Sequence, residues 1–181
     1  MNQHTAIILA GGKSTRMGED KGLMLYQGKP MMEHVIDAVL PLTNRILISS
    51  NSDAYKQFNY PIFTDKILDK GPLGGIVTAL AHSQSEINWI LSCDSPLITT
   101  AMLQILIDQL GEYDAVVPQT GEKIHPLIAV YRKSILNRLE EHVALNRLRM
   151  RDVLDGLNVN YFNVSSKDHV YFRNFNSKAD L

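Results

Sequence analysis

The sequence predicts an α/β protein with three layers in one domain, in which helices cover both faces of a mostly parallel β-sheet. Short apolar runs alternate with helical patterns through the first two-thirds of the chain, which is typical of a parallel sheet built from β-α-β units. The length of 181 residues suits one domain. Because no linker or internal repeat divides the chain, we expect one Rossmann-like domain over 1–181.

The first half of the chain supplies three strands. The run 5–10 has apolar residues on both faces, as a buried parallel strand does. The glycine-bearing loop 11–30 follows it, and 31–42 then spaces its apolar residues as a helix does. The next expected elements are a strand at 45–49, a short helix at 54–59 and a strand at 60–64.

The second half continues this alternation. A Gly-Pro turn opens a helix over 71–81, and the apolar run 88–92 is the fourth strand. Thr99 or Thr100 can cap a helix over 101–110. The remaining expected elements are strands at 115–118, 127–131 and 159–164 and helices at 134–145 and 150–157.

Composition narrows the class of protein. The chain is 45% hydrophobic and 20% charged, with a net charge of −1, so it can bury a core but offers nucleic acid no general positive field. The single cysteine, Cys93, excludes an internal disulfide and a multi-cysteine zinc site. The first ten residues lack a basic leader, and no apolar run approaches the ~20 residues of a membrane span. We expect a cytoplasmic protein without a membrane or nucleic-acid partner.

Four of the expected strands end in glycine or polar residues. These residues are Gly11 with Gly12, Asn51, Asp65 and Asp94. In open α/β sheets, ligands bind beyond the carboxyl ends of the strands. We therefore expect these residues to converge on one site.

The loop after the first strand has the composition of a phosphate-binding loop. Its glycines let backbone N–H groups approach a phosphate or a base closely, and Arg16 and Lys21 add the charge that a triphosphate needs. It is not a Walker A loop, because Ile7 stands where that motif requires glycine, and its glycines lack the dinucleotide-binding spacing. A polar surface loop is the alternative interpretation.

The segment Leu-Ala-Gly-Gly-Lys-Ser-Thr-Arg-Met-Gly-Glu-Asp-Lys at 9–21 resembles the signature loop of the molybdenum cofactor guanylyltransferases, the MobA-type enzymes. It is similar, more loosely, to that of the sugar-phosphate nucleotidylyltransferases. The resemblance covers nearly all of the chain. It implies a nucleotidyltransferase-type fold, with a nucleotide-binding part at about 1–98 and an acceptor-binding part at about 99–181.

The resemblance also implies roles for the loop. The main chain of four residues would contact guanine and ribose: Leu9, Ala10, Gly11 and Gly12. Arg16 and Lys21 would lie on the phosphates and act in catalysis.

Asp94 is the expected Mg²⁺ ligand. A carboxylate just past a buried strand can hold Mg²⁺ together with water and substrate phosphates, and the family's Cys-Asp-x-Pro segment falls here with Asp94 as its ligand. A capping or turn aspartate is the structural alternative. We expect the neighbouring Cys93 to be a packing residue, because nothing nearby in the sequence supplies a base that would activate its thiol.

Two further residues are nucleotide-binding candidates. The resemblance implies that Asp65 accepts hydrogen bonds from guanine or ribose, although a turn-capping aspartate fits nearly as well. Asn51 matches an asparagine that some family members place two residues earlier, where this chain has Ser49. A simple turn asparagine is the alternative.

The acceptor side rests on three family-like segments. Gly74 lies in a Gly-Pro-Leu-x-Gly turn whose helix N-terminus could face an anion. His125 begins a His-Pro-x-x-Ala stretch and would lie near the pterin or its phosphate, although a lone histidine is more often structural. Asn174 and Asn176 belong to a closing Asn-x-Asn-Ser motif. Arg147, Arg149 and Arg151 form a basic cluster. It could bind an anionic pterin, or it could be a solvated helix face.

Together these features predict an enzyme that transfers GMP from GTP to the terminal phosphate of molybdopterin, or Mo-molybdopterin, with Mg²⁺, and releases pyrophosphate. Its product would pass to an apo-molybdoenzyme or that enzyme's chaperone. A related enzyme could use CTP or a sugar phosphate, but the Gly11-Gly12 pair favours the guanylyl branch. A non-catalytic GTP-binding regulator would not need both Lys21 and Asp94. The absent Walker A motif counts against a generic NTPase.

Overall fold

A computed structural model describes residues 4–11, 20–64, 70–175 and 180 of the chain. Within these residues the main sheet has eight strands, in the order β10-β7-β9-β6-β1-β4-β5 with β8 paired to β7. Their bounds are β1 His4–Leu9, β4 Ile46–Ser49, β5 Ile62–Phe63, β6 Ile87–Ser92, β7 Ala115–Thr120, β8 Lys123–Ile124, β9 Ile128–Arg132 and β10 Val159–Asn163. A separate hairpin pairs β2 Leu25–Tyr26 with β3 Lys29–Pro30.

The prediction of a mostly parallel sheet is confirmed around β1. This strand pairs in parallel with β4 and with β6, and β4 pairs in parallel with β5. The strand β9 runs antiparallel to both of its neighbours, β6 and β7. A short connection joins β7 to β9, and such a connection allows only an antiparallel return, because a parallel strand needs a long crossover. The sheet is therefore mixed.

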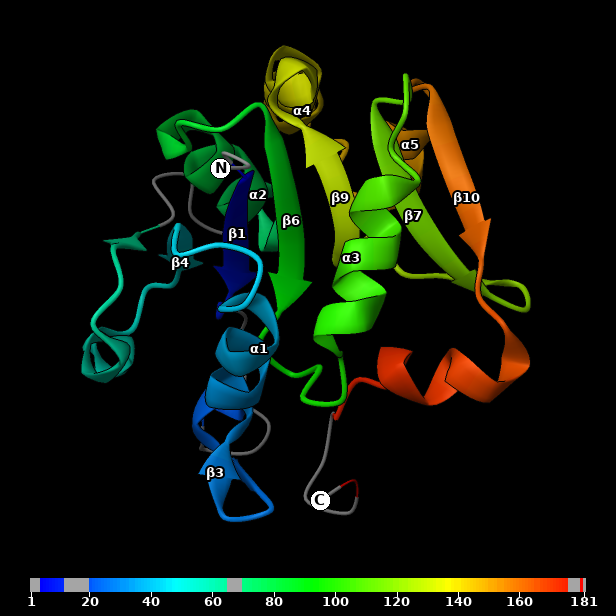
Figure 1. Ribbon diagram of the computed structural model, residues 1–181. Coiled ribbons are helices and arrows are strands. Elements are labelled where there is room, and N and C mark those ends of the chain that lie inside the picture. The colour runs from blue at the N-terminus through cyan, green and yellow to red at the C-terminus, as the bar shows by residue number, and fades with distance from the viewer. Residues whose placement is uncertain (1–3, 12–19, 65–69, 176–179, 181) are drawn as a thin grey trace.

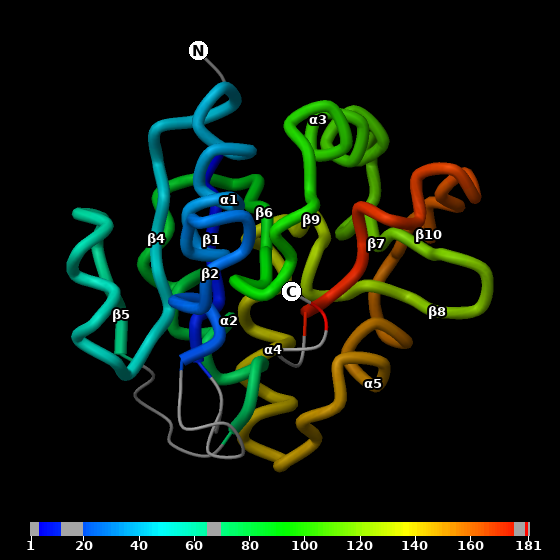
Figure 2. Tube along the Cα trace, turned by 90° about the horizontal axis from the view of Figure 1, so that it is seen from below, coloured from blue at the N-terminus to red at the C-terminus, as the bar shows by residue number. Residues whose placement is uncertain are grey.

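Helices cover both faces of the sheet, as the sequence predicts. The α-helices are α1 Met31–Val39, α2 Gly71–His82, α3 Thr100–Asp108, α4 Leu136–Ala144 and α5 Met150–Leu154. The 3-10 helices are η2 Lys21–Leu23, η3 Asp53–Phe58, η4 Lys133–Ile135 and η5 Ser166–Phe172. Figures 1 and 2 show α1 and α3 on one face of the strands and α2, α4 and α5 on the other.

The side-chain alternation of the strands explains these layers. In β1, Ala6 and Ile8 belong to the core under α1 and α3, whereas Ile7 and Leu9 belong to the core under α2 and α4. Successive strand residues point to opposite faces. A strand covered on both sides must therefore be apolar at nearly every position.

The boundaries differ from the expected ones where caps and prolines act. The helix expected at 31–42 ends at Val39. Leu40 still has helical dihedral angles and donates its N–H to the Ile36 carbonyl, but Pro41 has no N–H with which to continue the helix. Thr99 is the cap of α3, since its hydroxyl accepts a hydrogen bond from the backbone N–H of Met102 at 3.3 Å. The helix expected at 54–59 is the 3-10 helix η3. In the part of the chain that the structure describes, no helix is long and apolar enough to span a membrane.

Candidate functional site

The candidate site lies where β1, β4 and β6 end, at the lower edge of the sheet in Figure 1. Backbone hydrogen bonds continue beyond the ends of these strands: Ala10 N–H donates to the Ser49 carbonyl at 2.8 Å, and Cys93 N–H to the Leu9 carbonyl at 3.1 Å. The Ser50 hydroxyl also donates to the Ala10 carbonyl at 2.9 Å. The three segments that leave the strands are thus held side by side.

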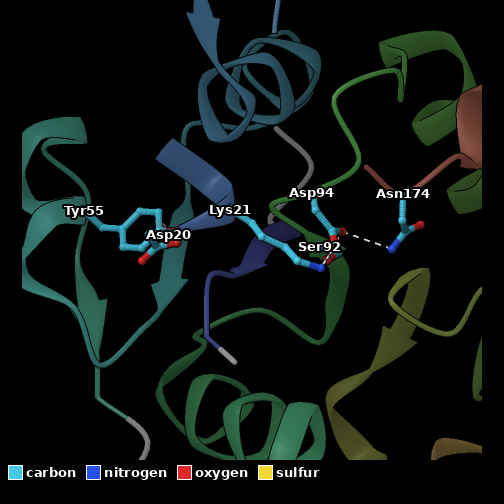
Figure 3. Close-up of polar contacts among 6 residues, drawn as sticks. All are labelled: Asp20, Lys21, Tyr55, Ser92, Asp94 and Asn174. Carbon is cyan, nitrogen blue, oxygen red and sulfur yellow. Dashed lines mark hydrogen bonds and ion pairs between the residues drawn. The ribbon is translucent and has the colours of Figure 1, made fainter. Parts of the chain in front are cut away.

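The Asp94 carboxylate is the centre of this site (Figure 3). Its Oδ1 accepts hydrogen bonds from Ser92 Oγ at 2.6 Å and from Asn174 Nδ2 at 3.0 Å. Lys21 Nζ lies 3.5 Å from its Oδ2. Only 7% of Asp94 is exposed, and a buried charge requires such partners because burial removes its water. The structure therefore brings together three residues that the sequence predicts, and adds Ser92.

The C-terminal segment is fixed against this carboxylate. Phe175 N–H donates to the Asp94 main-chain carbonyl at 2.8 Å. The Phe175 ring is buried in a small cluster with Met24 and Met31, and it meets the Tyr26 ring edge-on, with centroids 4.9 Å apart. Anchoring by Phe175 thus places the Asn174 amide at the site.

The loop that carries Lys21 is held from the other side. Asp20 precedes η2, and its carboxylate accepts a hydrogen bond from the hydroxyl of Tyr55, a fully buried residue of η3. Sequence reasoning did not identify Tyr55, Asp20 or Ser92 as site residues. Ser92 stands two residues before Asp94, a spacing visible in the sequence, but the pairing of Tyr55 with Asp20 depends on tertiary packing.

Cys93 is a packing residue, as predicted. Its side chain is buried in the core with α1 and α3. Burial raises the pKa of the thiol, and the negative charge of Asp94 raises it further. A neutral buried thiol is a poor nucleophile, so these surroundings agree with a packing role for Cys93.

The structure describes some of the other predicted site residues and not the rest. Gly12, Arg16, Asp65 and Asn176 lie outside the described residues. Leu9 and Ala10 are buried at the end of β1, whereas Gly11 and Asn51 are exposed beside them. Gly74 is buried in the first turn of α2, whose N-cap residue, Lys70, makes no side-chain capping hydrogen bond. Uncapped N–H groups at such a terminus can receive an anion.

His125 lies on the β7 and β9 side of the sheet. Its Nε2 is 2.7 Å from Thr120 Oγ1, and its ring packs on Phe172 of η5 with centroids 5.1 Å apart. Burial lowers the pKa of His125, and the nearby charges of Lys123 and His169 lower it further, to about 4. The imidazole is therefore uncharged at neutral pH.

The three arginines of the basic cluster lie near the start of α5, and all of them are exposed to solvent. They are Arg147, Arg149 and Arg151. The described residues hold no group of three or more His, Cys, Asp or Glu side chains that could bind a metal.

Comparison with known proteins gives consistent matches. Residues 6–161 match the family described as MobA-like NTP transferase domain. A Flavobacterium johnsoniae protein named probable molybdenum cofactor guanylyltransferase is 43% identical over 100% of this chain and 96% of its own length. A Vibrio parahaemolyticus protein named molybdenum cofactor guanylyltransferase is 34% identical over 99% of this chain and 93% of its own.

A solved structure has the same fold. It is the Archaeoglobus fulgidus protein described as molybdopterin-guanine dinucleotide biosynthesis protein A. The TM-score is 0.81 at 23% identity, over 97% of this chain and 94% of that one.

Proposed function

The chain belongs to the MobA-like NTP transferase family, and on this premise we propose that it transfers GMP from GTP to the terminal phosphate of molybdopterin. The observation that supports this most strongly is the pairing of Lys21 with the buried Asp94 where β1 and β6 end. A cation beside a carboxylate at the carboxyl edge of a parallel sheet suits a nucleoside triphosphate that carries a metal.

The reaction is an in-line displacement at phosphorus. An oxygen of the molybdopterin phosphate attacks the α-phosphorus of GTP and forms a new P–O bond. The bond from the α-phosphorus to the oxygen that bridges to the β-phosphate breaks, and pyrophosphate leaves with the electron pair. Such transfers depend on positioning and charge neutralisation rather than on a protein nucleophile. The buried, neutral Cys93 agrees with this chemistry.

Lys21 is placed to offset the negative charge that develops on pyrophosphate. Its side chain is 28% exposed and its ammonium borders the Asp94 carboxylate, so it can reach a phosphate entering the same space. A preorganised cation stabilises charge that grows in the transition state. We propose Arg16 as its partner on the phosphates.

Asp94 suits Mg²⁺ in its donor chemistry. Its Oδ1 is held by two neutral donors, Ser92 and Asn174, and its Oδ2 faces a cation already. Mg²⁺ is usually bound by one or two carboxylates, substrate phosphates and water. When bound, Mg²⁺ supplies positive charge that offsets the triphosphate. Asp94 would hold it, and Ser92 and Asn174 would keep the carboxylate oriented.

The remaining assignments follow the family resemblance. We propose that the main chain of 9–12, with Asn51 and Asp65, binds the nucleotide, in a part of the chain at about 1–98. The acceptor would bind in the part at about 99–181, at His125, Asn174 and Asn176. Gly74 of α2 would also contact it. We also propose that the enzyme works in the cytoplasm and hands its product to an apo-molybdoenzyme or its chaperone.

The test is pyrophosphate release with Mg²⁺ and each of GTP, CTP, ATP and UTP, with and without molybdopterin. The proposal predicts release with GTP only when molybdopterin is present. Release with CTP instead would keep the mechanism and overturn the base preference. Tight GTP binding without release would point to a regulator.

A further inference from the structure

Tyr55 is not among the predicted site residues, yet its side chain contacts the loop that carries Lys21. The residue is completely buried in η3, and its hydroxyl donates to the Asp20 carboxylate, immediately before Lys21. Figure 3 shows Tyr55 and Asp20 on one side of Lys21 and Asp94 on the other. The side chain of Lys21 therefore extends from a backbone that Tyr55 holds toward the carboxylate of Asp94.

The absence of a side chain at Gly22 lets Tyr55 pack closely against the backbone next to Lys21. A Cβ atom at position 22 would lie 2.5 Å from the Tyr55 oxygen and 3.1 Å from the Cβ of Cys93. The backbone after Lys21 is thus packed between Tyr55 and Cys93, the residue next to Asp94. Because Cys93 N–H is bonded to the Leu9 carbonyl, one side of this packing is fixed to the end of β1.

The hydroxyl of Tyr55 also provides the Asp20 carboxylate with a hydrogen-bond donor. Burial raises the pKa of Tyr55, and the Asp20 carboxylate that accepts its hydrogen bond raises it further, so the phenol stays protonated and remains a donor. Without this donor, the Asp20 carboxylate would be a competing partner for the adjacent Lys21 ammonium. Charge-assisted hydrogen bonds of this kind are the stronger ones in proteins.

We propose that Tyr55 is a positioning residue for the transfer reaction, which fixes Asp20 and the Lys21 backbone so that the Lys21 ammonium is directed to the triphosphate. Because Tyr55 is completely buried, its proposed action is through Lys21 and not through contact with the substrate. The inference rests on the proposed function, because it assigns Lys21 to the phosphates of GTP.

The test compares Tyr55→Phe with Tyr131→Phe. Both tyrosines are buried, and the Tyr131 hydroxyl donates to the Pro126 carbonyl at 2.9 Å. Tyr131 packs in the core under α2 and α4, so Tyr131→Phe is a matched loss of one part-buried hydrogen bond. We expect Tyr55→Phe to lower kcat for pyrophosphate release by roughly tenfold to a hundredfold, as small misplacements of a catalytic group do. Tyr131→Phe should keep the wild-type kcat.

A binding measurement provides a readout independent of turnover. By calorimetry, Tyr55→Phe should weaken GTP binding by about tenfold, the scale of one charge-assisted hydrogen bond, and leave guanosine binding unchanged. Equal weakening of GTP and guanosine, or a melting temperature well below that of Tyr131→Phe with unchanged kcat in the folded protein, would show a purely structural role and overturn the inference.

The Lys21→Met background separates the two proposals. If Tyr55 acts through Lys21, adding Tyr55→Phe to Lys21→Met should change kcat by less than about twofold, since coupled residues are not additive. Additive losses would overturn the inference. A wild-type protein that binds GTP but never releases pyrophosphate would instead refute the proposed function, and the GTP-against-guanosine comparison would still decide the role of Tyr55.

Discussion

Asn174 Nδ2 donates a 3.0 Å hydrogen bond to Asp94 Oδ1, although the two residues are 80 positions apart in the chain. The contact joins the segment after η5 to the loop after β6, and the N–H of Phe175 strengthens it by donating to the Asp94 main chain at 2.8 Å. The proposed metal ligand is therefore oriented by a part of the chain that the family resemblance assigns to the acceptor.

Removing the Asn174 amide should impair metal use. In Asn174→Ala, Oδ1 keeps only Ser92 as a neutral donor, so the carboxylate is less fixed. We expect a loss in kcat of about tenfold and a higher Mg²⁺ concentration for half-maximal rate, as is common for residues that support a metal ligand. The control is Asn160→Ala, which removes a comparable hydrogen bond to the Gln109 carbonyl at 3.0 Å. An unchanged Mg²⁺ dependence would contradict this role.

Replacing the Asp94 carboxylate should abolish turnover. Asp94→Asn keeps the shape and one acceptor oxygen but removes the charge, and Asp94→Ala removes both. We expect kcat to fall by at least roughly 10²–10³-fold in each variant, by analogy with the loss of other preorganised electrostatic groups, with far-UV circular dichroism unchanged. Asp37→Asn, which alters the exposed carboxylate that pairs with Lys29, is the control. Near-wild-type turnover of Asp94→Ala with Mg²⁺ would refute the metal assignment.

Gly22→Ala should destabilise the protein. The added methyl would lie 2.5 Å from the Tyr55 oxygen, so the packing around η2 must shift. Overpacking of this kind costs about 1–3 kcal/mol of unfolding free energy. Denaturant unfolding measures it. The double variant with Tyr55→Phe should lose less than the sum of the single losses, because the closest clashing atom is then absent. Strict additivity would argue against the described contact.

His125 should make stability depend on pH. Its pKa is lowered to about 4 in the folded protein from an ordinary value of 6.5, so the unfolded chain binds more protons between these two pH values. The contribution of His125 is therefore fully present above pH ~6.5 and is lost as the pH falls toward ~4, with a slope of at most about 1.4 kcal/mol per pH unit.

The measurement is the stability difference between wild type and His125→Gln. Other titrating groups largely cancel in this difference, so it should shrink as the pH falls from 7 to about 4.5. A constant difference across this range would show that the imidazole does not stay uncharged in the folded protein.

The sequence predicts the site residues that depend on local position. Asp94 lies just past the end of β6, where the rule that ligands gather beyond strand ends predicts a site residue. Lys21 belongs to the loop that follows β1, and the charge of that loop and its family resemblance predict its role. Asn174 is predicted from the family resemblance alone. That prediction places Asn174 at the acceptor and does not include its hydrogen bond to Asp94.

The missed features depend on tertiary packing or on weak local signals. The Tyr55 hydrogen bond to Asp20 joins residues that no periodicity relates. The hairpin of β2 and β3 turns at Gln27 and Gly28, which both have positive φ, as a type I′ turn requires. Because glutamine is not a usual residue at such a turn, this part of the loop carries little hairpin signal. The antiparallel insertion of β9 likewise follows from its short connection to β7 and not from its composition.

The most direct test uses GTP labelled at its α-phosphorus and measures which product carries the label. The protein is incubated with molybdopterin, Mg²⁺ and the labelled GTP, and the products are separated by chromatography. The account predicts label in a guanine dinucleotide of the pterin, with pyrophosphate released in equal amount, and no such product from Asp94→Ala. Label that remains in GTP, or that appears only in GDP or GMP, would contradict it.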